Sequence, residues 1–328
     1  MKALTQLSLV FCLTASGLSH AAEQDPYVAI YDKVIQANAN HAVQYCADLQ
    51  EALDSDSADL RRQAFMRLTQ GWGRVQASYI LGAYDIAAMD YPLMVDYFHM
   101  SKENIHESLA RVMKSDSSAS KALYKNSYKT LGALDDVMFS GPWSERRHEM
   151  ADVISASVCK RLTLIRDGYQ EHRADFLADQ DKALSLLVNA EIENIYKTRD
   201  WRIAQISGLT KKTLGKPEPE HQQYPYSQAS WGFIGAILAT NQQLLADDQQ
   251  PNVATIVAAK GGSEGLVAVQ QALDASLLAY QQAPADHNYN TNDMIPLFQG
   301  LLDLQKAFYR QLVGRIGVTA SLIDADGD

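Results

Sequence analysis

The chain has 328 residues, of which 47% are hydrophobic and 21% are charged, and its formal net charge is −10. This apolar content is enough for a folded core and excludes an intrinsically disordered chain. The acidic excess argues against binding to nucleic acid or to anionic lipid, because both need clustered Lys and Arg. With only 18 Gly and 9 Pro, the chain lacks the frequent turn residues of a fold built from many short strands.

Residues 1–21 are predicted to be a secretory signal peptide. Lys2 supplies the positive start, residues 4–18 are apolar, and a Ser-His-Ala sequence ending at Ala21 supplies the small-residue cleavage signature. The apolar run is too short for a comfortable membrane span, and the bulky residues before Cys12 do not suit a lipidated cysteine. We therefore expect cleavage after Ala21 or the next residue, and export of a soluble protein to the periplasm or cell envelope.

Two cysteines, Cys46 and Cys159, remain after this cleavage. Cysteines in an oxidising compartment have the opportunity to pair. A bridge across roughly 110 residues would stabilise the fold by about 4–5 kcal/mol in the chain-entropy model. Both cysteines lie in helical segments, so two buried free thiols are the alternative, since sequence supplies no distance between them.

Apolar residues recur with helical spacing from the start of the mature chain. They predict a helix at 28–35 and a second that begins after the N-cap Ser57 and extends through Val75. After a break at residues 90–92, a short helix capped by Ser101 includes 105–112. A serine-rich loop at 115–118 precedes a helix that ends near Phe139.

The sequence Ser140-Gly141-Pro142 is the strongest interruption in the interior, and we place a boundary there between an N-terminal helical bundle, 22–141, and a C-terminal one, 142–328. The two bundles form one domain. Further helices are predicted at about 144–177, after Asp181, from Ser227 or Ser230 to 245, from Ser263 through 273, and from Asn292 to 312. Few segments alternate with the period of a strand, so the predicted fold is all-α, built from helix bundles.

The common catalytic motifs are absent or incomplete. A zincin helix needs a second His four residues after the first, but Ala110 occupies that position after His106. His148 and Asp152 share a helix face and could ligate a metal, although a solvated charged face accounts for them more simply. Neither the nucleophile elbow of a serine hydrolase nor a Walker phosphate loop occurs.

Two acidic features remain. Asp135 and Asp136 lie in an apolar helix and point about 100° apart, so they do not form a bidentate pair; either one faces a cleft or both face water. The sequence Asp324-Ala-Asp326-Gly-Asp328 resembles the start of a calcium loop, but the later ligands of such a loop do not follow. An acidic turn is the simpler interpretation.

Four regions, in this order, resemble the imelysin family of bacterial envelope proteins: 72–98, 131–141, 226–231 and 317–328. The second resembles the helix that carries the family's Gly-x-His-x-x-Glu motif, and the last resembles its Asp-Gly-Asp ending. The resemblance extends over the whole mature chain. It implies an all-α fold of two bundle-like halves with a cleft between them, export, and a role in iron regulation or uptake. Founding members of the family were described as metallopeptidases.

The resemblance places Gly132 at the His of this motif and Asp135 at its Glu. Gly supplies no ligand, whereas a catalytic zinc takes three protein ligands. Positions i and i+3 share a helix face, so we expect both residues to face the cleft. Asp135 is then the best candidate for metal contact, and Asp135→Ala is expected to weaken ligand binding with little effect on stability.

The resemblance favours a non-catalytic binding component linked to iron or haem uptake, without excluding a purely structural envelope protein. A metal-dependent peptidase with an unusual ligand set is the alternative. Iron or another divalent metal is the candidate cofactor, and an iron-related ligand or an envelope transport partner is the candidate partner. Ferrous iron, a ferric chelate, haem and peptide all remain open as ligands. The predicted cleft residues are Asp96, Gly132, Asp135, Asp136, Ser230, Asp326 and Asp328.

Overall fold

A computed structural model describes residues 25–100, 103–246, 249–284 and 288–320. The fold is all-α, as predicted, and these residues include no β-strand. The predicted signal peptide, Asp326 and Asp328 lie outside the described residues.

The helices follow one another with short connections. In chain order the α-helices are α1 Pro26–Ile30, α2 Gln36–Leu53, α3 Ala58–Ala77, α4 Tyr91–Val95, α5 Ile105–Met113, α6 Ala119–Ala122, α7 Leu131–Phe139, α8 Glu145–Glu171, α9 Arg173–Ala178, α10 Gln180–Lys197, α11 Ser230–Leu245, α12 Val253–Ala259, α13 Ser263–Gln282 and α14 Thr291–Ala307. Three segments are π-helical: η1 Tyr31–Ile35, η5 Thr198–Ala204 and η7 Phe308–Leu312. Five are short 3₁₀-helices: η2 Leu81–Ala83, η3 Ile86–Ala88, η4 Asn126–Lys129, η6 Pro219–His221 and η8 Val313–Arg315.

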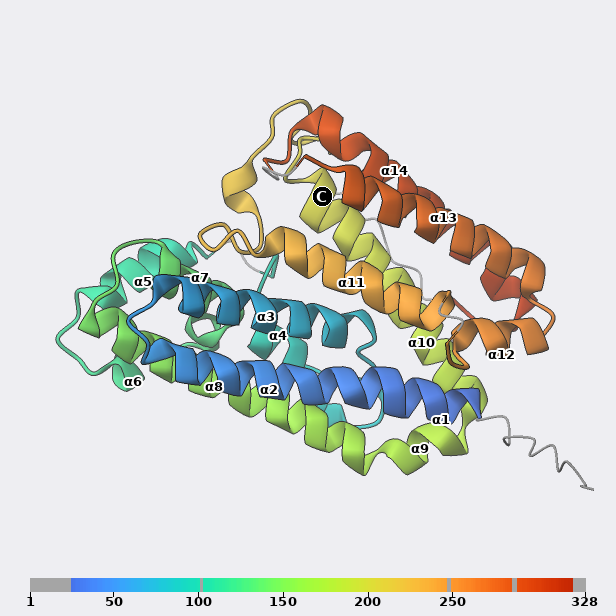
Figure 1. Ribbon diagram of the computed structural model, residues 1–328, viewed down its shortest axis with the longest axis horizontal. Helices are drawn as coiled ribbons and strands as arrows, with labels where there is room; N and C mark the ends of the chain where they lie inside the picture. Colours follow the sequence, from blue (N-terminus) through green and yellow to red (C-terminus); the bar gives the residue numbers. More distant parts are fainter. Residues whose placement is uncertain (1–24, 101–102, 247–248, 285–287, 321–328) are drawn as a thin grey trace, which may run out of the picture.

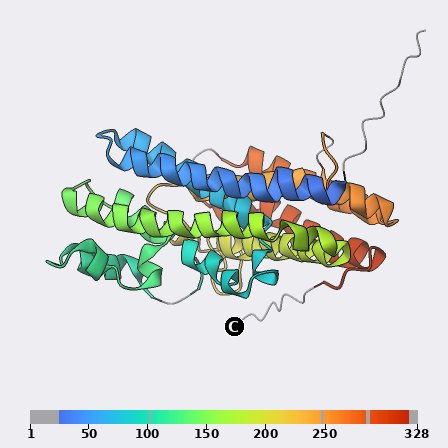
Figure 2. The same ribbon diagram turned by 90° about the horizontal axis from the view of Figure 1, so that it is seen from below.

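The longer helices pack in two groups (Figure 1). In the first group, α2 packs against both α3 and α8, and α7 packs against α8. In the second, α13 packs against α11 and α14, and α10 packs against α14. The contact between α3 and α11 joins the groups. The boundary expected after residue 141 stays a prediction; α8, which follows it, lies along α2 of the first group (Figure 2).

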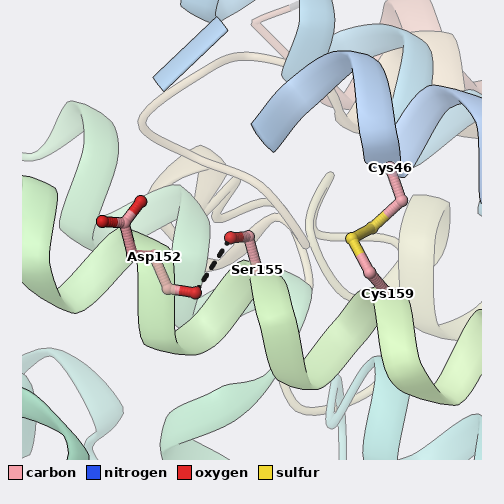
Figure 3. The surroundings of a disulfide bond; sticks show 4 residues. All are labelled: Cys46, Asp152, Ser155 and Cys159. Atoms are coloured by element: carbon pink, nitrogen blue, oxygen red, sulfur yellow. Dashed lines mark hydrogen bonds between the residues drawn. A yellow bond between two sulfur atoms is a disulfide. The ribbon is translucent and has the colours of Figure 1, made fainter. Parts of the chain in front are cut away.

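A disulfide bond fastens α2 to α8 (Figure 3). The sulfur atoms of Cys46 and Cys159 are 2.05 Å apart and the Cα atoms 5.5 Å apart, which is within the usual range for a disulfide. Of the two alternatives that the sequence left open, the paired cysteines are therefore the one that the structure contains.

The helix ends show where local sequence predicted structure well and where it did not. The Ser57 hydroxyl accepts a hydrogen bond from the Leu60 amide at 3.3 Å, so this residue is the N-cap of α3. The long helix expected at 144–177 is interrupted at His172, which separates α8 from α9. Pro92 is the second residue of α4 and does not interrupt it, because the amide hydrogens of the first turn have no partner within the helix.

Candidate functional site

A cavity of about 270 Å³ lies where α7 faces the loop between η6 and α11. One wall comes from the segment after α4 and from the start of α5, and a second comes from α7. The loop supplies the third, including Gln223 and Tyr226. A larger hollow, about 430 Å³, lies between α13 and α14, but it contains none of the residues that the sequence singled out.

Of the two adjacent carboxylates of α7, Asp135 contacts the loop between η6 and α11 and does not line the cavity. Asp135 is fully buried, and its two oxygens accept hydrogen bonds from the amides of Tyr226 at 3.0 Å and Ser227 at 2.9 Å. Burial raises the pKa of Asp135 to about 6, although these hydrogen bonds act in the opposite direction. Gly132 lines the cavity and Asp135 does not. The carboxylate therefore anchors the loop that closes the site.

Helical geometry explains this difference. Residues three apart are rotated by about 300°, and residues four apart by about 400°, so the latter lie closer to the same direction. Asp136 accordingly shares the cavity wall with Gly132. It is 7% exposed, and it accepts a hydrogen bond from the Ser140 hydroxyl at 2.9 Å.

The other oxygen of Asp136 holds a histidine from a different helix. His106 Nδ1 lies 2.6 Å from Asp136 Oδ2 and 2.9 Å from the Tyr226 hydroxyl. In the sequence, His106 has no second histidine four residues later on its own helix. Its actual partner is 30 residues away in sequence, and no local spacing reveals it.

The wall is open at Gly132. A Cβ atom placed on this residue would meet no other atom within 4 Å. Gly132 therefore leaves a notch in the cavity wall.

Asp96 belongs to a buried hydrogen-bond network at the edge of the cavity. It is 6% exposed and accepts hydrogen bonds from the side-chain amide of Gln223 and from the Tyr224 hydroxyl. The backbone amide of Phe98 donates a third hydrogen bond to it at 3.2 Å. Burial raises the pKa of Asp96, although these donors and the nearby Arg202 act in the opposite direction. The carboxyl group is thus already engaged in hydrogen bonds with other residues of the protein.

Arg202, from η5, continues this network on its inner side. Its guanidinium donates to Gln223 Oε1 at 2.8 Å and to Gln76 Oε1 at 2.9 Å, and burial lowers the pKa of Arg202 to about 10. Gln223, Tyr224 and Arg202 had no signal in the sequence, since each acts through a contact with a distant segment.

Ser230 fastens the loop from its far end. Its hydroxyl accepts a hydrogen bond from the Tyr224 amide at 2.8 Å, and Arg62 donates to the Ser227 carbonyl at 2.8 Å. The structure therefore brings Asp96, Gly132 and Asp136 to one cavity, while Asp135 and Ser230 hold the loop that covers it. That these residues bind a ligand stays a prediction.

Metal-ligating side chains do not converge in the described part of the chain: no three His, Cys, Asp or Glu residues there lie close enough to share an ion. His148 Nε2 lies 3.2 Å from Asp54 Oδ1 and 3.8 Å from Asp152 Oδ1 on the surface. None of the helices in these ranges is both long and apolar enough to cross a membrane.

Comparison with known proteins agrees with this architecture. The family model for imelysin matches residues 28–310. An imelysin-like protein from Psychrobacter arcticum 273-4 has a similar structure, with a TM-score of 0.74 at 16% identity over 90% of this chain and 95% of that one. A putative iron-regulated protein A precursor from Parabacteroides distasonis ATCC 8503 has a TM-score of 0.70 at 11% identity over 90% and 96%. No curated protein matches the chain.

The fold is thus that of an imelysin-like helical protein. The chain belongs to the imelysin family.

Proposed function

We propose that this protein is an exported, non-catalytic binding component of bacterial iron uptake, and that its ligand occupies the cavity beside α7. The observation that carries the proposal is the open wall at Gly132, next to His106 and the carboxylate of Asp136. A cavity with a few convergent polar groups is the usual form of a small-molecule site.

The iron-related part of the proposal is supported by the comparisons. The structure from Parabacteroides distasonis is named a putative iron-regulated protein A precursor, and the two chains share a fold. The disulfide between α2 and α8 supports export, because such bonds persist in oxidising compartments such as the periplasm.

The peptidase alternative needs a catalytic metal and therefore a set of side chains that can ligate one. A catalytic zinc takes three protein ligands and keeps one open position. At the motif positions, Gly132 has no side chain, and both oxygens of Asp135 accept hydrogen bonds from loop amides. These residues do not fit a three-ligand zinc site, so the donor set favours binding over peptide hydrolysis.

The cavity size favours a small ligand. At about 270 Å³ it lies below the roughly 300–1,000 Å³ of sites for drug-sized molecules. Among the open candidates, ferrous iron and small ferric chelates suit this volume better than haem or a peptide.

The first prediction fills the notch. Gly132 lines the cavity and a Cβ there meets no atom within 4 Å, so Gly132→Leu is expected to extend a side chain into the cavity. We expect the mature protein to bind ⁵⁵Fe as ferrous ion or ferric citrate in equilibrium dialysis. Gly132→Leu should bind at least tenfold more weakly, with a melting temperature no lower than that of wild type, because Leu favours a helix more than Gly does.

Gly314→Leu is the matched control, because its Cβ also meets no atom and the residue lies outside the cavity. Equal iron binding by wild type and Gly132→Leu would contradict the assignment of the cavity. Metal-dependent cleavage of an unfolded protein substrate, abolished by a chelator, would support the peptidase instead.

A further inference from the structure

One nitrogen atom in the cavity is available to a ligand. Carboxylate oxygens accept hydrogen bonds, so the 2.6 Å contact with Asp136 Oδ2 assigns the ring hydrogen of His106 to Nδ1. The Tyr226 oxygen, 2.9 Å from the same nitrogen, is a second polar neighbour there. The other ring nitrogen, Nε2, therefore has its lone pair free in the neutral imidazole.

This arrangement is the one that prepares an imidazole for a metal. Ligating histidines usually donate their other ring N–H to a carboxylate or carbonyl, which fixes the tautomer and increases the basicity of the ligating nitrogen. The His106 side chain is 56% exposed, whereas that of Asp136 is 9% exposed. A buried carboxylate thus supports an accessible ring on the cavity wall.

The other imidazole of the cavity is already engaged. His99 Nε2 lies 2.6 Å from Gln205 Oε1, and the ring stacks on Trp201 with centroids 4.5 Å apart. Although both rings line the cavity, only His106 is oriented by a carboxylate.

We propose that His106 Nε2 coordinates a transition-metal ion that brings most of its own ligands, as water or as a small chelator. The inference rests on the proposed function and names the ligand class of the same cavity. A site in which the protein supplies all the ligands does not fit, because no three His, Cys, Asp or Glu side chains of the described residues lie close enough to share an ion. Imidazole suits iron, copper, nickel and zinc, and an ion with its own ligand shell needs one protein donor and space.

The charge around His106 suits such an ion. The lining includes the carboxylates of Asp96, Glu103, Asp136 and Glu220 and no Lys or Arg. Although Glu103 is paired with Lys125 at 2.6 Å and Asp96 is held in the buried network, the exposed Glu220 remains on the rim. Metal-bound waters could donate hydrogen bonds to it.

The test uses the untagged mature protein with four probes: hydrated Ni²⁺, Ni²⁺–nitrilotriacetate, hydrated Cu²⁺ and Cu²⁺–nitrilotriacetate. Calorimetry compares wild type with His106→Gln, and electron paramagnetic resonance of the copper forms reports nitrogen coordination. Comparing hydrated with chelated ions shows whether water or a chelator supplies the remaining ligands of the bound metal. We expect His106→Gln to bind at least tenfold more weakly and to lose the imidazole signal, and Asp136→Asn to bind about 10–100-fold more weakly as a positioning variant.

His172→Gln is the matched control, because His172 Nδ1 also pairs with a carboxylate, Asp175 Oδ2, at 2.7 Å, but outside the cavity. Its binding should equal that of wild type. Equal binding by wild type and His106→Gln would overturn the role of His106, while leaving cavity binding to the Gly132→Leu test. Binding lost equally in His172→Gln would also overturn it, by showing a surface site. No binding of any probe by wild type would overturn the metal assignment itself.

Discussion

Two neighbouring residues, Asp135 and Asp136, differ in role because a helix turns each to a different neighbour. Asp135 meets backbone amides of the loop, and Asp136 meets His106. We therefore no longer expect Asp135→Ala to leave stability unchanged. Removing the carboxylate leaves the amides of Tyr226 and Ser227 without this acceptor, and the loss for a buried amide such as that of Ser227 is roughly 1–3 kcal/mol.

The pKa of Asp135 predicts a dependence of stability on pH. Its folded value of about 6 lies above the ordinary value of 3.8, so between these values the folded state binds more protons than the unfolded state. The free energy of unfolding therefore falls as pH rises from about 4 to about 6, and this contribution is constant at higher pH. A shift of about two units corresponds to about 3 kcal/mol.

Asp135→Asn should remove this contribution, so the difference in unfolding free energy between wild type and variant changes by up to about 3 kcal/mol over this pH range. Urea unfolding at several pH values measures it. The exposed Asp152→Asn, on α8, is the control. A difference between wild type and Asp135→Asn that stays constant with pH would contradict the raised pKa.

Close approaches between helices depend on single residues. The π-helical segment η5 brings Arg202 into the buried network at the cavity. Such π-helical turns are frequent at functional sites.

Helix α13 contacts η7 at Gly265. A Cβ there would lie 2.2 Å from the Gln311 carbonyl oxygen and 2.7 Å from its carbon.

Gly265→Ala should consequently destabilise the protein by about 1–3 kcal/mol, because backbone atoms must shift to admit the methyl group. Gly132→Ala is the matched comparison. Its Cβ meets no atom, and replacing a helical Gly with Ala stabilises by up to about 1 kcal/mol. Urea denaturation of the two variants should give changes of opposite sign, and a stabilising Gly265→Ala would show that the α13–η7 contact is looser than the structure indicates.

On the scale of the whole molecule, packing between α3 and α11 joins two helix groups, and the disulfide closes the first group. The bond links residues 113 positions apart. In the chain-entropy model, a bridge of about this span stabilises by roughly 4–5 kcal/mol, because it restricts the unfolded chain.

The double variant Cys46→Ser/Cys159→Ser should therefore unfold at a lower urea concentration, with a loss of roughly 4–5 kcal/mol. Reductant should lower the stability of wild type in the same way and leave the double variant unchanged. Thiol titration of denatured, unreduced protein should find neither cysteine free. Two reactive thiols per mature chain would contradict the bond.

The sequence by itself determined what depends on neighbouring residues. Helical spacing predicted an all-α fold, and Ser57 was identified as an N-cap because this interaction extends over three residues. Cys46 and Cys159 could be recognised as a pair that has the opportunity to bond, but not as one that does, since no spacing gives the distance between α2 and α8.

Only the tertiary structure decided the composition of the site. Asp135 meets amides 91 and 92 residues further along the chain, and Asp136 meets a histidine 30 residues before it. His106 does not complete a zincin motif, because Ala110 occupies the position of the second ligand on its own helix. Its actual partner lies on α7, and a contact between helices depends on how their faces pack, which the period of either helix does not specify.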